Sequence, residues 1–263
     1  MSAGAPVALI TGAAGGLGTG MCEALLKRDW RVLAHVRNVE QGRQLAAAGA
    51  HVLAADLSSR TQVKGLISHV RRTTARIDVL VNNAALGYGA PDTTRQVTED
   101  GIESRLAVNV LAPLALMEGL KGLLGNGSRV LNMASTNQEL VDVDDLQLIR
   151  FWNREASYRQ SKALMLVLTQ VFAERWKPLK VAVNAIHPGT RLPTKIVLES
   201  GVEPMGSLER GIEICVDQLL QSDPGTAMFV RAGELPVRLD ELYPVTEEGE
   251  ALVAKLKDLL AWH

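Results

Sequence analysis

Short apolar runs alternate along this chain with longer amphipathic stretches, from the N-terminus to about residue 190. Short apolar runs fit buried strands, whereas apolar residues spaced three and four apart fit one face of a helix. A chain that alternates in this way folds as a parallel sheet with helices on both faces. The predicted strands cover residues 7–11, 31–36, 51–55, 79–82, 129–133 and 181–186, and the predicted helices cover 18–28, 39–48, 61–73, 101–124 and 156–177.

The 263 residues suffice for one large α/β domain, and no repeat, low-complexity segment or linker divides them. We therefore expect a single domain over residues 1–263, in which residues 191–220 form a flexible insertion and a helix that cover the site. The formal net charge of −1 gives no reason to expect nucleic acid or an anionic membrane as a partner. No apolar run approaches the roughly 20 residues that span a bilayer, so no membrane span is predicted.

The two cysteines, Cys22 and Cys215, lie in apolar helical patterns and fit buried, inert thiols in a reducing compartment. The first six residues carry no basic segment ahead of the first strand, so we expect no signal peptide and a cytoplasmic location. No cluster of Cys and His has the spacing of metal ligands, and no metal site is predicted.

The turn after the first predicted strand is rich in glycine, with Gly12, Gly16 and Gly18 around Leu17. Residues without a Cβ let the backbone approach a pyrophosphate, and the next helix offers free N–H groups and a positive dipole end. We therefore assign these four residues to cofactor binding. The alternative is a glycine-rich loop that only turns, since the spacing Gly-x-x-x-Gly-x-Gly differs from Gly-x-Gly-x-x-Gly.

The second predicted strand ends in His35-Val36-Arg37-Asn38, without an acidic residue. A carboxylate here would accept hydrogen bonds from a ribose diol and repel a 2′-phosphate. Arg37 can instead pair with a 2′-phosphate through its planar guanidinium, so we prefer NADP(H) over NAD(H) and assign Arg37 and Asn38 to the cofactor. The alternative is a surface arginine that covers the adenine face without selecting for phosphate.

Two further strand ends supply candidate cofactor contacts. Asp56 and Leu57 follow the third strand, where the Asp56 carboxylate can accept a hydrogen bond from the adenine amino group. Asn83, Ala84 and Ala85 follow the fourth strand, and small residues there let the backbone pass beside a ribose. Asn83 can equally be a structural residue that ties two strands together.

Tyr158 and Lys162 lie four residues apart in a predicted helix and therefore share one face, with about 6 Å between them. An ammonium that close to a phenol favours the phenolate and lowers the pKa of the tyrosine, so the hydroxyl can exchange a proton near neutral pH. The spacing alone is a weak signal, but the glycine-rich turn and Ser135, at the end of an apolar run, precede it in this order. Together the three features indicate one active site.

With Asp56, residues 82–85, Asn109 in Val-Asn-Val and the pair Pro188-Gly189, these motifs resemble the short-chain dehydrogenase/reductase family over about residues 6–232. The resemblance implies a single-domain, Rossmann-like, doubly wound parallel sheet of about seven strands with helices on both faces. It also implies a nicotinamide cofactor and hydride transfer between a carbonyl and an alcohol.

The resemblance gives each catalytic residue a role. Tyr158 would donate a proton to the carbonyl oxygen, or remove it in the reverse direction, and Ser135 would orient that oxygen. Lys162 would hold the nicotinamide ribose hydroxyls and depress the tyrosine pKa. Asn109 would sit at a distortion in the long helix and hold a water that relays protons to Lys162; the alternative is an ordinary polar helix residue.

The segment after the sixth strand matches the family's contact with the carboxamide side of the nicotinamide and the start of its substrate loop. Pro188, Gly189 and Thr190 are the residues of this segment that we assign to the cofactor. His187, which precedes them, is more simply a structural residue at the end of a strand.

Two departures from the family pattern are visible. Ser135 and Tyr158 are 23 residues apart, wider than is usual in the family, and the extra segment resembles the branch that contains retinol dehydrogenases and light-dependent protochlorophyllide reductases. This segment is expected to form a wall of the substrate pocket. Ala85 stands where the family usually has Gly, a change small enough to keep the loop.

The leading function is an NADPH-dependent carbonyl reductase or alcohol dehydrogenase that acts on a small to mid-sized, partly apolar substrate. The same site can serve an isomerase, epimerase, dehydratase or C=C reductase, and a non-catalytic nucleotide-sensing protein is a third class. The pocket is expected from residues 86–93, 136–153 and 191–205, where Arg191 and Lys195 either hold an acidic group or are ordinary lid charges. The family often forms homodimers or homotetramers through its two long helices, although this branch includes monomers.

Overall fold

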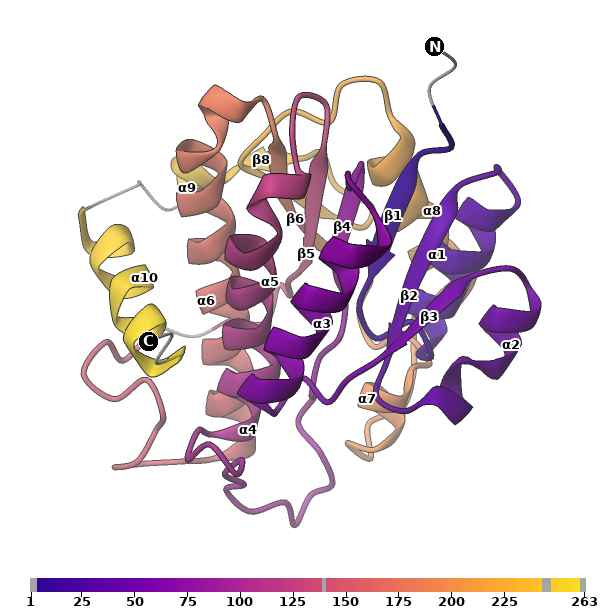
Figure 1. The fold of residues 1–263 in the computed structure, drawn as a ribbon. Helices are drawn as coiled ribbons and strands as arrows, with labels where there is room; N and C mark the ends of the chain where they lie inside the picture. The colour runs from indigo at the N-terminus through magenta and orange to yellow at the C-terminus, as the bar shows by residue number, and fades with distance from the viewer. Residues whose placement is uncertain (1–3, 139–140, 243–246, 261–263) are drawn as a thin grey trace.

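One sheet lies between two layers of helices in the computed structural model, which describes residues 4–138, 141–242 and 247–260 (Figure 1). Its eight strands follow the order β3-β2-β1-β4-β5-β6-β7-β8, and all neighbours pair in parallel except β7 and β8. The order reverses between β1 and β4, which is where ligands bind in open α/β sheets. The strands are β1 (Val7–Ile10), β2 (Arg31–Val36), β3 (His51–Ala54), β4 (Val79–Asn82), β5 (Arg129–Met133), β6 (Ala182–His187), β7 (Met228–Arg231) and β8 (Val237–Arg238).

The predicted Rossmann-like, doubly wound α/β fold is confirmed, and the two-residue antiparallel strand β8 extends the sheet beyond the seven strands that were expected. A π-helical segment at Ala107–Leu111 joins α4 to α5, and 3-10 turns lie at Val39–Gly42, Lys121–Leu123 and Lys177–Leu179. The α-helices are α1 (Gly16–Leu26), α2 (Arg43–Ala47), α3 (Arg60–Thr73), α4 (Ser104–Leu106), α5 (Ala112–Leu120), α6 (Arg154–Arg175), α7 (Lys195–Leu198), α8 (Leu208–Leu220), α9 (Leu239–Leu242) and α10 (Glu247–Leu260).

The central strands are buried on both faces, which explains why they read as continuous apolar runs. Successive residues of a strand point to opposite faces of the sheet. In β1, Leu9 packs with residues of α3, α5, α6 and α10, whereas Ala8 and Ile10 pack with residues of α1 and α8. The two helix layers therefore hold separate apolar cores, and the polar site has to lie at the ends of the strands.

The helix predicted over residues 101–124 differs from the prediction at both ends. Gly101 has a φ of +77°, a left-handed conformation, so the helix starts only at Ser104, where the Glu103 carboxylate accepts a hydrogen bond from the N–H of Leu106 at 2.8 Å. The helix ends as a 3-10 turn at Lys121–Leu123. The distortion that was predicted at Asn109 is confirmed, because the π segment spans that residue.

The second half of the predicted lid is helix α8, which also contributes to the core. Helix α8 packs against α1, and its buried Cys215, Val216 and Leu219 belong to the core on that face of the sheet. The start of α8 nevertheless reaches the glycine-rich turn, where a Cβ on Gly16 would lie 2.9 Å from the side chain of Leu208, so the covering role of residues 191–220 stays a prediction. Thr246, which the sequence suggests as the N-cap of the last helix, lies outside the described residues.

A buried chain of hydrogen bonds ties α6 to two central strands. The Asn82 side-chain amide donates to the Asn132 oxygen at 2.7 Å, and the Asn132 amide donates to the Thr169 hydroxyl at 3.0 Å. Thr169 in turn donates to the carbonyl of Met165 at 2.7 Å, within α6. Since Tyr158 and Lys162 stand on the same helix, this chain helps to fix their height above the sheet.

Thr169→Val is expected to lower the free energy of unfolding by about 1–3 kcal/mol, because it leaves the buried Asn132 amide without an acceptor. Denaturant unfolding followed by circular dichroism measures the change. Thr61→Val, at an exposed position of α3, is the matched control and should stay within about 0.5 kcal/mol of wild type. Equal stability of the two variants would contradict a structural role for this hydrogen bond.

Candidate active site

A cleft of about 1110 Å³ lies at the carboxyl ends of β1, β2, β4, β5 and β6, at the point where the strand order reverses. Asn38 and Asn109 are the two predicted site residues that do not line it. The Asn38 side chain instead accepts a hydrogen bond from the N–H of Gln41 at 3.2 Å, which caps the 3-10 turn after β2. The predicted residues that do line the cleft are Gly12, Gly16, Leu17, Gly18, Arg37, Asp56, Leu57, Asn83, Ala84, Ala85, Ser135, Tyr158, Lys162, Pro188, Gly189 and Thr190.

The glycine-rich turn fits a phosphate cradle. Gly12 has a φ of +64°, and a Cβ on it would lie 2.8 Å from the Cα of Ala84. A Cβ on Gly18 would lie 2.3 Å from the carbonyl oxygen of Gly12, so neither position accepts a side chain. Helix α1 starts at Gly16, and its cap residue, Gly15, has no side chain that could accept a hydrogen bond from the first N–H groups. Its first N–H groups therefore suit an anionic ligand, as the sequence predicts for a pyrophosphate.

Asn83 ties the glycine-rich turn to the loop after β4. Its side-chain amide donates to the carbonyls of Thr11 at 2.8 Å and Gly12 at 3.1 Å. The Thr11 hydroxyl accepts from the N–H groups of Asn83 at 2.9 Å and Ala84 at 3.0 Å. Of the two roles that the sequence leaves open for Asn83, these contacts support the structural one, although the residue also borders the cleft.

His35 is a site residue that sequence reasoning left without a role. It is buried, its Nδ1 accepts from the N–H of Gly12 at 3.3 Å, and its Nε2 lies 3.0 Å from the carbonyl of Ala55. Burial lowers the pKa of His35, against opposing contributions from the Ala55 carbonyl and the Asp56 carboxylate. A neutral imidazole can accept from one partner and donate to the other, so His35 joins the ends of β1 and β3.

Arg37 and Asp56 face the cofactor end of the cleft. Arg37 is exposed, and Asp56 is partly buried. Burial pushes the pKa of Asp56 upward, but hydrogen bonds from Ser58 and the nearby Arg37 charge outweigh it, and the net shift is downward. The site therefore offers an ionised carboxylate and, one strand away, a guanidinium that reaches solvent.

Tyr158, Lys162 and Ser135 meet at the other end of the cleft. Helix α6 brings the ammonium of Lys162 to 5.6 Å from the ring centre of Tyr158, and Ser135 at the end of β5 hydrogen-bonds the tyrosine hydroxyl. The Lys162 Nζ donates to the carbonyl of Met133 at 2.8 Å. The predicted shared face is therefore present.

The pKa of Tyr158 is shifted in the direction opposite to the prediction. Burial raises it to about 12, the neighbouring Tyr88 adds to the rise, and the hydrogen bond with Ser135 opposes it. Burial also lowers the pKa of Lys162 to about 8. Spacing on a helix predicted the proximity of the two groups but not the loss of solvent, which here is the larger effect.

Asn109 is buried under the loop that follows β4. Its side-chain oxygen accepts from the N–H of Leu86 at 2.7 Å, while its amide donates to the carbonyl of Leu86 and the hydroxyl of Ser161, both at 2.9 Å. Ser161 donates to the carbonyl of Tyr158 at 2.7 Å. Asn109 thus links the cleft-lining loop to the turn of α6 that carries the tyrosine, and its water-holding role stays a prediction.

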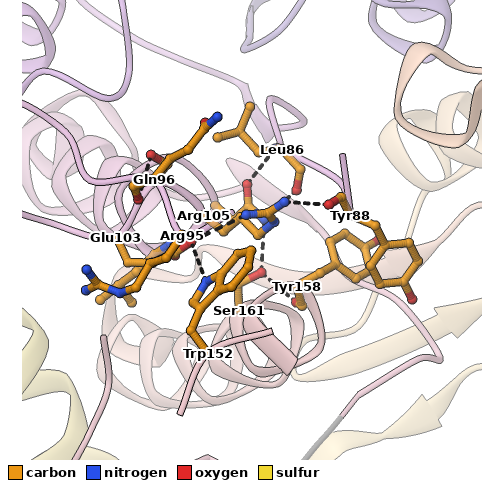
Figure 2. A network of polar contacts seen from close by, with 12 residues as sticks. Leu86, Tyr88, Arg95, Gln96, Glu103, Arg105, Trp152, Tyr158 and Ser161 are labelled. Atoms are coloured by element: carbon orange, nitrogen blue, oxygen red, sulfur yellow. Dashed lines mark hydrogen bonds and ion pairs between the residues drawn. The ribbon is translucent and has the colours of Figure 1, made fainter. Parts of the chain in front are cut away.

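Arg105 is a second residue that the sequence did not mark as part of the site (Figure 2). Its guanidinium donates to the carbonyls of Gly87 and Tyr88, each at 2.6 Å, and forms an ion pair with Glu103 at 3.5 Å. Both charged side chains are almost fully buried, at 5% and 3% exposure. The indole of Trp152 donates to the same Glu103 at 3.4 Å, so the segment before α6 is tied into this network.

The network places Tyr88 beside Tyr158. The rings of Tyr88 and Tyr158 meet edge to face with their centres 4.6 Å apart (Figure 2), and the Tyr88 hydroxyl accepts from the Asn137 amide. Thr136 and Asn137 line the cleft, but Trp152 does not. The expectation that residues 136–153 form the pocket wall is therefore wrong for most of the described part of that segment, whose contacts lie instead with Glu103 and with Lys255 of α10.

The sequence model described as short chain dehydrogenase matches residues 6–201. The chain belongs to the short-chain dehydrogenase family. It is 30% identical to human retinol dehydrogenase 14 over 228 residues, covering 76% of this chain and 67% of that protein. It is 31% identical over 214 residues to an uncharacterized oxidoreductase of Emericella nidulans, covering 79% and 77% of the two chains.

Solved structures agree with this assignment. An uncharacterized protein from Mycobacterium paratuberculosis superposes with a TM-score of 0.79 at 25% identity, covering 97% of this chain and 93% of that one. A Burkholderia multivorans short-chain dehydrogenase/reductase with bound NADP gives a TM-score of 0.69 at 26% identity, covering 89% and 99%. This short-chain dehydrogenase is thus an oxidoreductase of a family that binds a nicotinamide cofactor, and the resemblance to the retinol dehydrogenase branch is confirmed.

One helical stretch among the described residues is long and apolar enough to cross a membrane. It is Ser104–Leu123, and 72% of its apolar window is buried inside the fold. Its residues pack with those of α3 and α6 in the core on one face of the sheet. The stretch therefore has the surroundings of a core helix.

Lys162→Met is expected to stabilise the cofactor-free protein at pH 7 by about 1–3 kcal/mol. Burial lowers the pKa of Lys162 from 10.5 to about 8. A protonated lysine at this position therefore lowers the free energy of unfolding. This cost is complete below pH 8 and disappears as pH rises to 10.5, where the lysine is neutral in both states. The stability difference between variant and wild type should shrink over that window.

Urea unfolding at pH 7, 9 and 10.5 tests this expectation. Lys121→Met, at an exposed position, is the matched control, and its stability difference should not follow that pH window. If the Lys162→Met difference kept one value at every pH, burial of the ammonium would not govern its ionisation.

Proposed function

We propose that this short-chain dehydrogenase is an NADPH-dependent oxidoreductase that transfers a hydride between the nicotinamide and the carbonyl or alcohol of a small to mid-sized, partly apolar substrate. The observation that carries the proposal is one continuous cleft. It runs from the glycine-rich turn, which suits a pyrophosphate, to Ser135, Tyr158 and Lys162, which suit proton exchange with a carbonyl oxygen. The nicotinamide supplies the hydride when bound.

The protonation state of the catalytic end favours carbonyl reduction. With its pKa raised to about 12, Tyr158 is a neutral phenol at pH 7 and can donate a proton to a carbonyl oxygen. Ser135, which hydrogen-bonds the tyrosine hydroxyl, is positioned to orient the same oxygen. Lys162 adds a buried cation that attracts the negative charge developing there, and it would donate to the ribose hydroxyls of a bound cofactor.

Cofactor choice rests on the end of β2. Arg37 is exposed at the rim of the cleft, and the strand that it follows ends without a carboxylate. A guanidinium there attracts a 2′-phosphate, so NADP(H) is preferred over NAD(H). Gly12, residues 16–18, Asp56 and residues 83–85 would hold the rest of the nucleotide, and residues 188–190 would contact the carboxamide side.

Apolar side chains next to the catalytic end support a partly apolar substrate. Leu86 borders the cleft on one side, and Ile196, Val197 and Val202 border it from the segment that we propose as the lid, residues 191–207.

We further propose a cytoplasmic protein of one domain that forms homodimers or homotetramers through α5 and α6.

Other reactions of the same site remain alternatives. An isomerase, epimerase or dehydratase would return the cofactor to its starting state, whereas a reductase consumes NADPH in proportion to product. The neighbouring Ser135, Tyr158 and Lys162 argue against a non-catalytic nucleotide sensor. NADPH consumption with a panel of ketones, aldehydes and activated alkenes separates these classes.

Tyr158→Phe is expected to slow carbonyl reduction by about 10²–10⁴-fold, the usual cost of removing a general acid. The dissociation constant for NADPH should stay near the wild-type value, because the ring is kept. Tyr88→Phe removes the neighbouring hydroxyl in the same cleft and is the matched control, with a smaller expected loss. A Tyr158→Phe enzyme that kept more than about a tenth of the wild-type rate would refute the acid role.

Arg37→Asp is expected to weaken NADPH binding by about 10- to 150-fold, the value of a charge-assisted contact, and to improve NADH binding. Fluorescence titration of both cofactors into wild type and variant gives the constants. Arg43→Asp makes the same change at an exposed position that does not line the cleft. Unchanged NADPH affinity in Arg37→Asp would remove Arg37 from the phosphate site.

A further inference from the structure

Arg159 follows the catalytic tyrosine on α6 and lines the same cleft. Its side chain is half-buried, and its Nε is shielded from solvent without a hydrogen-bond partner. An arginine in this condition is costly, since a buried polar group without a partner loses the hydrogen bonds that water gave it. The role of Tyr158 in proton exchange makes no use of this guanidinium.

Two other cations at this end of the cleft, Arg154 and Lys195, have acidic partners. Arg154 pairs with Glu155 at 2.7 Å and donates to the carbonyl of Gly89 at 3.1 Å. Lys195 pairs with Glu199 at 3.4 Å, which favours the reading of that lysine as an ordinary lid charge. Arg159 has no ion pair or hydrogen bond with any residue that the structure describes.

The cleft as a whole has more positive than negative side chains. The cations on its lining are Arg37, Arg154, Arg159, Lys162, Arg191 and Lys195, and the carboxylates are Asp56, Glu155 and Glu199. The chain as a whole is nearly neutral, with a formal net charge of −1. After the pairs above are set aside, Arg159 is a half-buried cation on the helix of Tyr158 that still lacks an anion, whereas Arg37 and Arg191 are exposed.

We infer that Arg159 binds a carboxylate of the substrate, so that the natural substrates are oxo acids or the corresponding hydroxy acids. A guanidinium offers two parallel N–H donors that match a carboxylate. The apolar side chains of Leu86, Ile196 and Val202, which border the same cleft, suit the carbon skeleton between the carboxylate and the carbonyl. This inference rests on the proposed carbonyl reduction, and it defines the substrate class.

Matched substrates test it directly. A series of oxo acids with the ketone two to six carbons from the carboxylate is compared with the methyl esters of the same acids, at saturating NADPH. For at least one chain length, wild type should show kcat/KM about 10- to 150-fold higher for the acid than for its ester. A ratio at or below one at every length would overturn the inference, while turnover of the esters would leave the proposed function intact.

Variants then assign the preference to one side chain. Arg159→Gln should bring the ratio close to one, mainly through a higher KM for the acid, and Arg159→Lys should keep part of the preference. Arg210→Gln, at an exposed position of α8 that does not line the cleft, is the matched control and should keep the wild-type ratio. If Arg159→Gln instead weakened NADPH binding and left the ratio unchanged, Arg159 would be a cofactor contact and the inference would fail.

A binding measurement covers the case in which no ketone in the panel is reduced. Calorimetric titration of the NADPH complex with benzoate, phenylacetate and 4-phenylbutyrate is compared with the matching primary amides. At least one acid should bind about tenfold or more tightly than its amide in wild type, and the difference should be lost in Arg159→Gln. Equal affinity for acids and amides would overturn the inference, even if the proposed function had already failed.

Discussion

The close approach of the glycine-rich turn to the loop after β4 is the constraint on which the site depends. Gly12 lies so near Ala84 that a side chain there would overlap its backbone. The contact is held from both sides, because Asn83 donates to the carbonyls of the turn and His35 accepts from the N–H of Gly12. The first three parallel strands and β4 therefore end at one shared edge, and the cleft opens there.

The catalytic end is fixed by a second set of contacts to the same loop. Asn109 holds both backbone groups of Leu86, and Arg105 holds the carbonyls of Gly87 and Tyr88. Both residues come from the helical stretch that contains the π segment, so the distortion of that helix and the shape of the cleft are coupled. The loop then places the ring of Tyr88 against that of Tyr158, with 4.6 Å between the ring centres.

Sequence patterns predicted the features whose signals lie within a short stretch of the chain. The strands, the glycine-rich turn and the pair Tyr158 and Lys162 follow from periodicity and spacing, and the family resemblance added Asn109 at the distortion. His35 and Arg105 could not be found in this way, because their partners lie elsewhere in the chain and the hydrogen bonds exist only once β1, β2 and β4 are aligned. The prediction that residues 136–153 line the pocket was wrong for a related reason. The length of an insertion does not indicate which neighbouring elements it packs against.

The pKa shift of Tyr158 is the property that residue spacing predicted in the wrong direction. A charged ammonium nearby lowers the pKa of a phenol, whereas loss of solvent raises it, and here burial is the largest effect on both groups. With pKa values of about 12 for Tyr158 and about 8 for Lys162, the pair at pH 7 carries one proton on the phenol and one positive charge on the lysine. That is the protonation state from which a carbonyl oxygen can be protonated. In the proposed function, alcohol oxidation would need a phenolate instead, so the raised pKa of Tyr158 supports carbonyl reduction as the proposed direction.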